Sequence, residues 1–205
     1  MIIAGAGGHA LELLDILISQ GNTEDLLFFD DNKPDSLFQG TFPIIRSQGE
    51  LQNALQEDSR FILGTGNPKI RFRLYERLIK LGGKLTCVTG QGVRQSNYST
   101  ITDADIFTGC FIGPNTQLGK GCLINTGAQI HHEVQIGEFS EVNPGAILLG
   151  GVKVGSFSSI GANATILPLL SIGNNVIIGA GAVVTRDVPD GVNVVGVPGR
   201  IISNI

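Results

Sequence analysis

The C-terminal half of this 205-residue chain repeats with a period of six residues. From Ile106 onward, every sixth residue up to Val184 is Ile, Leu or Val, which makes fourteen consecutive positions. An even period fits the alternation of side chains along β-strands, whereas it does not fit the 3.6-residue turn of an α-helix. A hexapeptide period is typical of a parallel β-helix, in which each hexad supplies one short strand and one turn.

The residues around these aliphatic positions fit the same geometry. The residue two places before each aliphatic residue is mostly small, and the residue after it is often Gly. Small residues suit crowded corners, and Gly allows the positive φ that tight turns need. Three hexads should form one coil of about 18 residues that rises ~4.8 Å, so Ile106 to Val188 should form almost five coils.

The N-terminal half alternates strand and helix signals instead. Strands are predicted over 2–4, 26–29, 60–63 and 84–88, with helices over 8–20, after Ser47 and over 68–81. This order predicts a small Rossmann-like parallel sheet covered by helices. The chain is therefore expected to have two domains, an α/β domain over 1–90 and an all-β domain over 101–205, joined by the polar stretch Thr89–Thr100.

Composition excludes several classes of protein. Hydrophobic residues make up 42% and the net charge is −4, which argues against disorder. Only 14 residues are Lys or Arg, so neither nucleic acid nor an anionic membrane is an expected partner. No apolar run approaches the length of a membrane span, and a cytoplasmic location is expected. The three Cys lack CxxC spacing and suggest neither a zinc knuckle nor a disulfide framework.

The segment Gly5–Ala10 (GAGGHA) follows a predicted strand and opens a predicted helix. Closely approaching backbone and a helix N-terminus suit a phosphate group. The segment also fits G-x-G-x-x-A, with Asp30 further on, so an NAD site is one alternative and a simple tight turn is another. About 90 residues is half of a dinucleotide fold, which favours one nucleotide.

A second candidate site lies in the repeat, at His131, His132 and Glu133. Only five charged residues occur between 106 and 185, and three of them lie between 133 and 141. An imidazole can take up a proton near neutral pH, and a neighbouring carboxylate favours its charged form. The alternative is that these are solvated turn residues.

Together with the hexads, five motifs resemble those of the bacterial sugar O-/N-acyltransferases of the sialic-acid O-acetyltransferase and PglD-like group. The resemblance covers nearly the whole chain. It implies that the β-helix is left-handed and that the protein is a homotrimer with active sites between neighbouring β-helices. The motifs are Gly5–His9, Phe29–Asp31, Gly64–Asn67, Ile130–Glu133 and Val195–Pro198.

The resemblance also implies roles for single residues. His132 would be the general base, supported by Glu133, and no metal would be needed. Acetyl-CoA would lie along Gly150, Ala162 and Ala180, and near Glu141, where relatives often have a second His. A nucleotide-sugar would bind the N-terminal domain through Gly7, Gly8, His9, Asp30, Asp31 and Gly66.

The predicted function is acetyl-CoA-dependent N-acetylation of a nucleotide-linked amino sugar in bacterial surface-glycan biosynthesis. Three alternatives remain. One is O-acetylation of a sialic acid or another sugar hydroxyl by the same base. Another is a γ-type carbonic anhydrase, which uses three His on zinc, although no His follows His132 here. The last is a non-enzymatic β-helix that only binds its ligand.

Overall fold

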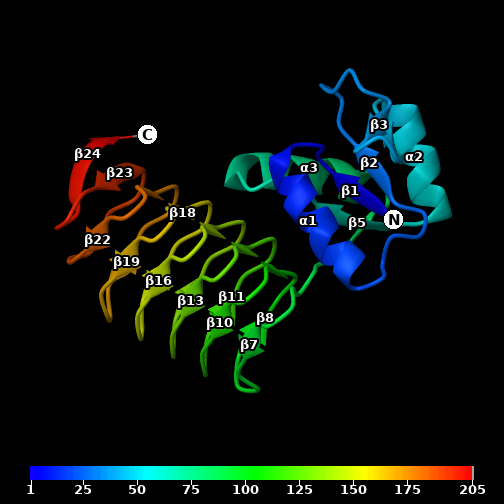
Figure 1. The fold of residues 1–205 in the computed structure, drawn as a ribbon. Helices are drawn as coiled ribbons and strands as arrows, with labels where there is room; N and C mark the ends of the chain where they lie inside the picture. Colours follow the sequence, from blue (N-terminus) through cyan, green and yellow to red (C-terminus); the bar gives the residue numbers. More distant parts are fainter. Residues whose placement is uncertain (205) are drawn as a thin grey trace. The chain divides into compact units, whose positions relative to one another are not determined.

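A computed structural model describes residues 1–204 of the protein and divides them into two compact units. The first comprises Met1–Gly66 and Ile70–Val88, and the second comprises Asn67–Lys69 and the residues from Thr89 onward. The first unit is an α/β structure, and the second is built from short stacked strands (Figure 1).

The sheet of the first unit has the strand order β3-β4-β2-β1-β5-β6. All neighbouring strands are parallel except β3 and β4, which are antiparallel. The strands are β1 (Ile2–Ala4), β2 (Leu27–Phe29), β3 (Leu37–Phe38), β4 (Phe42–Ile45), β5 (Arg60–Leu63) and β6 (Lys84–Leu85). The helices are α1 (Gly8–Ser19), α2 (Gln48–Glu57) and α3 (Pro68–Lys80).

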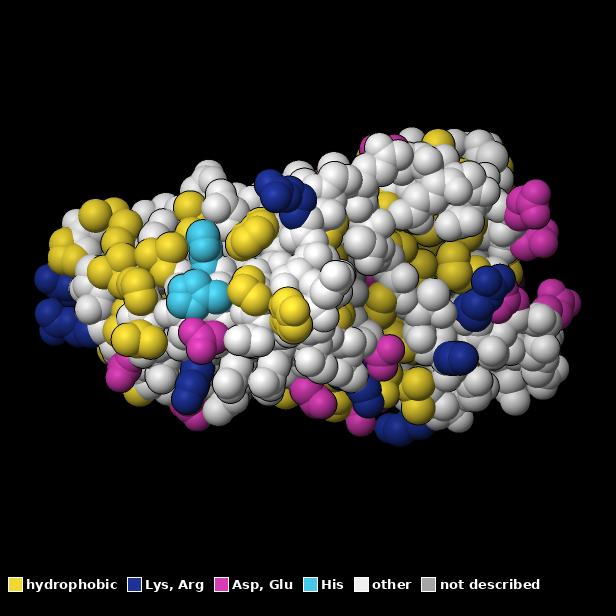
Figure 2. Space-filling view, turned by 90° about the horizontal axis from the view of Figure 1, so that it is seen from below, with side chains coloured by type: hydrophobic (Ala, Val, Ile, Leu, Met, Phe, Trp, Pro, Cys, Tyr) yellow, Lys and Arg dark blue, Asp and Glu magenta, His cyan; other side chains and the backbone are white. Residues whose placement is uncertain are grey.

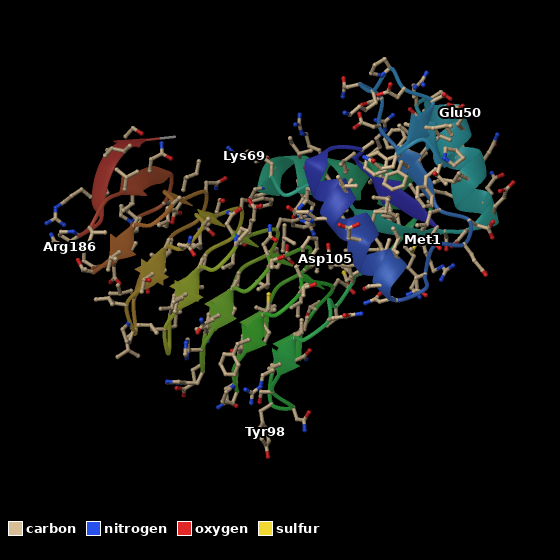
Figure 3. The ribbon with its side chains drawn as sticks, viewed as in Figure 1. Met1, Glu50, Lys69, Tyr98, Asp105 and Arg186 are labelled. Atoms are coloured by element: carbon tan, nitrogen blue, oxygen red, sulfur yellow. The ribbon has the colours of Figure 1, made fainter. Side chains whose placement is uncertain are left out.

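Local sequence explains where helix α2 begins. Helix α2 starts with a capping box, in which the Glu50 N–H donates to Ser47 Oγ and the Ser47 N–H donates to Glu50 Oε2, at 3.2 and 2.9 Å. Both bonds satisfy backbone donors that a helix N-terminus leaves open. Glu50 is labelled at this end of α2 in Figure 3.

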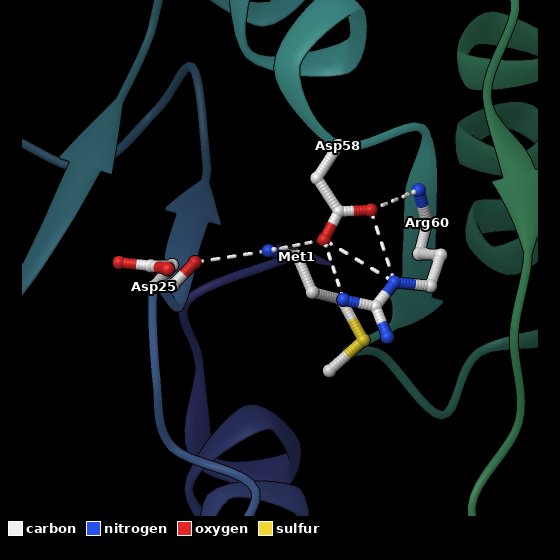
Figure 4. Close-up of polar contacts among 4 residues, drawn as sticks. All are labelled: Met1, Asp25, Asp58 and Arg60. Atoms are coloured by element: carbon white, nitrogen blue, oxygen red, sulfur yellow. Dashed lines mark hydrogen bonds and ion pairs between the residues drawn. The ribbon is translucent and has the colours of Figure 1, made fainter.

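A hydrogen bond and an ion pair hold the N-terminal amino group just before β1 (Figure 4). The amino group of Met1 donates to the Asp25 carbonyl at 2.9 Å and lies 3.1 Å from Asp58 Oδ2. Arg60 Nη2 donates to the same carboxylate oxygen at 2.7 Å. Hydrogen bonds from Arg60 hold the pKa of Asp58 well below its usual range. These contacts join the start of β1 to the segments before β2 and β5.

The second unit is a parallel β-helix with three faces. A residue on one strand pairs with the residue 18 positions further, as in Ile112 with Ile130 and Leu148 with Ile166, so one coil has 18 residues. Figure 1 shows the coils stacked in sequence order.

The three faces have the following strands. Face 1 comprises β7 (Arg94–Gln95), β10 (Phe111–Ile112), β13 (Gln129–Ile130), β16 (Ile147–Leu148), β19 (Thr165–Ile166) and β22 (Val183–Val184). Face 2 comprises β8 (Thr100–Ile101), β11 (Gln117–Leu118), β14 (Gln135–Ile136), β17 (Lys153–Val154) and β20 (Ser171–Ile172). Face 3 comprises β9 (Asp105–Ile106), β12 (Leu123–Ile124), β15 (Glu141–Val142), β18 (Ser159–Ile160), β21 (Ile177–Ile178), β23 (Val192–Val195) and β24 (Arg200–Asn204).

The turns between the faces form three edges. We call the turns from face 1 to face 2 edge A, those from face 2 to face 3 edge B, and those from face 3 to face 1 edge C. Inside the prism, all fourteen aliphatic residues of the hexad pattern belong to one core, and none is more than 4% exposed. The structure therefore confirms that the aliphatic residues spaced six apart form the core of the β-helix.

The structure differs from the sequence prediction near the start of the repeat. The predicted junction Thr89–Thr100 contains β7, which pairs with β10, so the β-helix begins before Ile106. Gln95 pairs with Ile112, 17 residues further rather than 18, and a polar residue takes the place of an aliphatic one. This one-residue slip hides the first coil from a strict six-residue search.

The α/β unit also holds more strands than predicted. Strands β3 and β4 were not expected, and the strand predicted over 84–88 is only Lys84–Leu85. The predicted helices 8–20 and 68–81 each end one residue earlier than expected, at Ser19 and Lys80.

Among residues 1–204, no helix combines the length and apolar character that crossing a membrane requires.

Candidate functional site

His132 and Glu133 form a hydrogen-bonded couple on edge A, in the turn between β13 and β14. His132 Nδ1 lies 2.9 Å from Glu133 Oε2, and the side chains are 60% and 63% exposed. An ionised carboxylate only accepts hydrogen bonds, so Nδ1 carries the hydrogen. In the neutral imidazole the lone pair is then on Nε2. The couple therefore presents a proton acceptor to whatever lies outside the edge.

The backbone around this couple is tied to both neighbouring coils. The Glu133 N–H donates to the Pro114 carbonyl at 2.9 Å, and the Gly151 N–H donates to the His132 carbonyl at 2.9 Å. Glu133 itself has a φ of 61°, in the left-handed region. Because the bonds come from both sides, the backbone that carries the imidazole is held in one place.

Gly150 makes room for the imidazole. A Cβ atom on Gly150 would lie 2.3 Å from both Nε2 and Cε1 of His132, which is closer than any real contact. Within residues 1–204, the Gly150 N–H donates no backbone hydrogen bond. Gly150, one coil along edge A, is thus the predicted acetyl-CoA residue that the structure brings next to His132.

His131 has a different environment. Its ring packs against Phe111, with 5.6 Å between the ring centroids, and it does not take part in the couple. Figure 2 shows histidine side chains on the surface of the β-helix among hydrophobic side chains, beside a carboxylate. The imidazoles thus lie at the border of an apolar surface.

The other predicted acetyl-CoA residues lie elsewhere on the prism. Glu141 is half-buried in β15 on face 3, where it accepts a hydrogen bond from Ser159 Oγ at 3.2 Å. Ala162 and Ala180 follow β18 and β21 and lie on edge C. One chain therefore does not bring these three residues to His132.

A second candidate site is a pocket of about 660 Å³ in the α/β unit, at the carboxyl ends of the parallel strands. Ligands of open α/β sheets bind at this end of the strands. The pocket is lined by Gly5–His9, Phe29–Lys33, Gly64, Thr65, Ile70, Arg73, Leu74 and Arg77. Gly64 and Thr65 line it, whereas the predicted Gly66 does not.

Glycines shape this pocket in two ways. At Gly5, φ is +118° and a Cβ would lie 2.8 Å from the Gly64 carbonyl oxygen, so the two loops can touch only because this residue is Gly. A Cβ at Gly7 or Gly8 would meet nothing within 4 Å. The protein itself does not fill that space, which leaves the N-terminus of α1 open to a ligand.

The two predicted carboxylates already have partners within the protein. Asp30 accepts hydrogen bonds from the backbone N–H groups of Ala6 and Asn32, each at 3.0 Å. Asp31 forms an ion pair with Arg77 at 2.7 Å, and the Arg77 guanidinium lies 4.6 Å from the centre of the Phe29 ring. The carboxylates therefore shape the loop and place a cation at the pocket.

The cations of this pocket were not predicted as ligands from the sequence. Lys33, Arg73 and Arg77 all line it, and Arg71 is buried below, donating to the carbonyls of Leu63 and Thr65 at 3.0 and 2.9 Å. On α3 these Arg residues look like an ordinary solvated face in the sequence. Only the folded arrangement distinguishes those that face the pocket.

His9 is uncharged in this setting. Burial, together with the smaller effect of the positive charge of Arg71, lowers its pKa from 6.5 to about 4. His9 can therefore offer a neutral imidazole to a ligand near neutral pH, but not a positive charge.

Among residues 1–204, no group of three or more His, Cys, Asp or Glu side chains is placed to hold a metal ion.

Comparisons with known proteins place the fold. Residues 1–78 match the PglD N-terminal domain family. A mutant of perosamine N-acetyltransferase from Caulobacter crescentus, in complex with CoA and GDP-perosamine, superposes with a TM-score of 0.92 and 27% identity, over 99% of this chain and 96% of that one. The chain has the fold of the left-handed β-helix sugar acetyltransferases, and its first 78 residues are similar to the PglD N-terminal domain.

Two further structures share this architecture. The acetyltransferase domain of PglB from Neisseria gonorrhoeae, in complex with acetyl coenzyme A, has a TM-score of 0.90 and 28% identity, over 98% of each chain. WeeI from Acinetobacter baumannii shares the fold at 24% identity and a TM-score of 0.73, over 98% of this chain and all of that one. No curated protein sequence matches the chain. The resemblance to left-handed β-helix sugar acetyltransferases is thus confirmed.

Proposed function

We propose that this protein transfers an acetyl group from acetyl-CoA to the amine of a nucleotide-linked amino sugar. The observation that carries the proposal is the His132–Glu133 couple, which leaves Nε2 as a proton acceptor on an exposed edge. The similarity to a perosamine N-acetyltransferase, with CoA and GDP-perosamine in its structure, supports the acyl donor and the acceptor class. The similarity to the PglB acetyltransferase domain, with acetyl coenzyme A in its structure, supports the same donor.

The chemistry follows from the couple. As the substrate amine attacks the thioester carbonyl, a C–N bond forms and the nitrogen must lose a proton, which His132 Nε2 accepts. Glu133 stabilises the resulting imidazolium. When the C–S bond breaks, the imidazolium returns the proton to the leaving thiolate, and CoA leaves as a thiol. Gly150 offers an N–H beside the imidazole, and we assign it to the oxyanion of the tetrahedral intermediate.

The pocket of the α/β unit is the proposed nucleotide site. The open N-terminus of α1 at Gly7 and Gly8, with Arg73 and Arg77 on the pocket wall, suits the phosphates of a nucleotide-sugar. His9 would contribute as a neutral hydrogen-bonding group, and Asp30 and Asp31 would act mainly by holding the loop and Arg77.

The proposed assembly is a homotrimer with active sites between neighbouring β-helices. It is supported by the placement of Glu141, Ala162 and Ala180 away from His132 on the same chain, since a second copy would have to supply them. We further propose that no metal takes part, that the enzyme acts in the cytoplasm, and that its product enters a bacterial surface polysaccharide.

A thiol-release assay tests the function. Acetyl-CoA is supplied with a panel of nucleotide-linked amino sugars and with matched sugars that carry only hydroxyl groups. We expect thiol release with an amino sugar, its near loss in His132→Ala, and its retention in His131→Ala, which removes the neighbouring imidazole. Turnover only with hydroxyl acceptors, or an unchanged rate in His132→Ala, would overturn the proposal.

A further inference from the structure

A buried hydroxyl group contacts the turn that carries His132. Thr116 lies on edge A one coil earlier and is completely buried. Its Oγ1 donates a hydrogen bond to the His131 carbonyl at 3.0 Å. That carbonyl belongs to the peptide unit between His131 and His132, so the bond fixes the plane from which the His132 side chain departs.

The same peptide unit is also held by close packing. A Cβ on Gly113 would lie 2.8 Å from the His131 carbonyl carbon and from the His132 nitrogen, so this glycine lets the peptide rest directly on the coil before it. Gly113 supports one side of the peptide, and Thr116 holds its oxygen. Rotation of the peptide would break the hydrogen bond and leave a buried polar group unpaired.

The Thr116 bond does not recur along its own edge, whereas the corresponding bond recurs along edge B. On edge B, the buried side chains of Cys122, Ser140 and Ser158 donate to the carbonyls 15 residues ahead in three consecutive coils, at 3.0, 2.7 and 2.8 Å. On edge A the three positions that follow Thr116 at 18-residue spacing are apolar, namely Val134, Val152 and Leu170. In the coil after His132, the Leu149 carbonyl accepts instead from the Val152 N–H of its own turn, at 3.3 Å.

We propose that Thr116 is a positioning residue for catalysis, which orients His132 by holding the carbonyl of His131. The inference rests on the proposed function, because it takes His132 as the base. Thr116 is fully buried, so it does not touch substrate and acts only through the turn. A displacement of the imidazole by about 1 Å can lower a rate by up to about a hundredfold.

Thr116→Val tests this, because it removes the hydroxyl and keeps the shape. We expect kcat to fall about tenfold or more while the KM values for acetyl-CoA and the sugar stay within about twofold. Thr116→Ser keeps the hydroxyl and should restore kcat to within about twofold of wild type. Ser158→Ala removes the corresponding bond on edge B and should lower the melting temperature without lowering kcat.

A double variant separates positioning from general damage. In a His132→Ala background, Thr116→Val should lower the residual rate no further, because the group that it positions is gone. An equal fall in both backgrounds, or unchanged kcat in Thr116→Val alone, would overturn the inference. If His132→Ala alone leaves turnover unchanged, the proposed base falls first, which distinguishes the two failures.

A readout without turnover completes the test. In ¹⁵N-edited spectra of the three imidazoles, Thr116→Val should shift or broaden the His132 ring signals and leave those of His9 unchanged. Unchanged His132 signals would contradict the proposed positioning whatever the activity.

Discussion

Glu133 holds a backbone conformation that its residue type disfavours. Its φ is 61°, and the corresponding positions in the adjacent coils are Asn115 and Gly151, which tolerate this region better. A carboxylate is kept there although the turn would form more easily without it. The reason that the structure offers is the 2.9 Å contact with His132. Strain of this kind often accompanies function.

Glu133→Asn should therefore separate stability from activity. We expect the free energy of unfolding to rise by about 0.5–1 kcal/mol, because Asn adopts positive φ at lower cost. Acetyl transfer should fall, because the shorter amide cannot stabilise the imidazolium. Denaturant unfolding and the thiol-release rate measure the two effects. Glu133→Gln is the control, since it removes the charge and keeps the strain; a fully active Asn variant would contradict the assigned role.

Gly150→Ala should impair activity with little change in stability. The added Cβ would meet the tip of the exposed His132 side chain and not the backbone, so the ring can rotate away at little cost to the fold. Rotation breaks the geometry of the base, and we expect kcat to fall at least about tenfold. Activity assays and thermal melts of the same samples measure this. Wild-type kcat would show that the ring position seen here is not the active one.

His9, in the first turn of α1, should make the α/β unit sensitive to mild acid. Its folded pKa of about 4 lies below its ordinary value of 6.5, so the unfolded chain binds more protons between these values. The contribution of His9 to the stability of the unit is therefore fully present above pH 6.5 and is lost progressively as the pH falls toward 4. Between pH 7 and pH 5 we expect a loss of about 2 kcal/mol.

His9→Gln provides the comparison, because Gln does not titrate. Urea unfolding followed at 222 nm reports α1, α2 and α3 of this unit, at pH 7 and at pH 5. The variant should lose clearly less stability than wild type over this range. Equal losses in both proteins would mean that other groups cause the acid sensitivity.

How much the sequence predicts depends on the element. The β-helix core is visible because each inward position from Ile106 to Val184 must be aliphatic to fill a narrow prism, and this requirement recurs every six residues. The first coil escapes prediction because Gln95 and a one-residue slip break the pattern. Strand β4 escapes because it contains Pro43, which disfavours a strand prediction.

The candidate sites show the same limit. The His132–Glu133 contact was predicted because adjacent residues need no knowledge of the fold to meet. The places of Arg73 and Arg77 in the pocket lining were not predicted, because the sequence of α3 does not tell which basic side chains face a pocket. Gly66 was expected at the pocket, but nothing in the motif distinguishes it from Gly64 and Thr65, which line it.

At the scale of the molecule, the proposed active site is divided between edges that one chain keeps apart. His132 and Gly150 lie on edge A, and Ala162 and Ala180 lie on edge C, with face 1 between them. A rigid prism cannot bend to join its edges. If acetyl-CoA contacts both sets of residues, edge A of one copy must face edge C of another.

Mixing two inactive variants tests this division. His132→Ala removes the base on edge A, and Ala180→Trp fills the exposed edge C with a bulky ring; each variant alone should be inactive while keeping the wild-type mass in light scattering. Co-expressed in equal amounts, they should recover about a quarter of the wild-type rate, because random assembly gives that share of interfaces an intact edge from each copy. Activity no higher than the sum of the separate variants would place the whole site within one chain, and the need for a second copy would disappear.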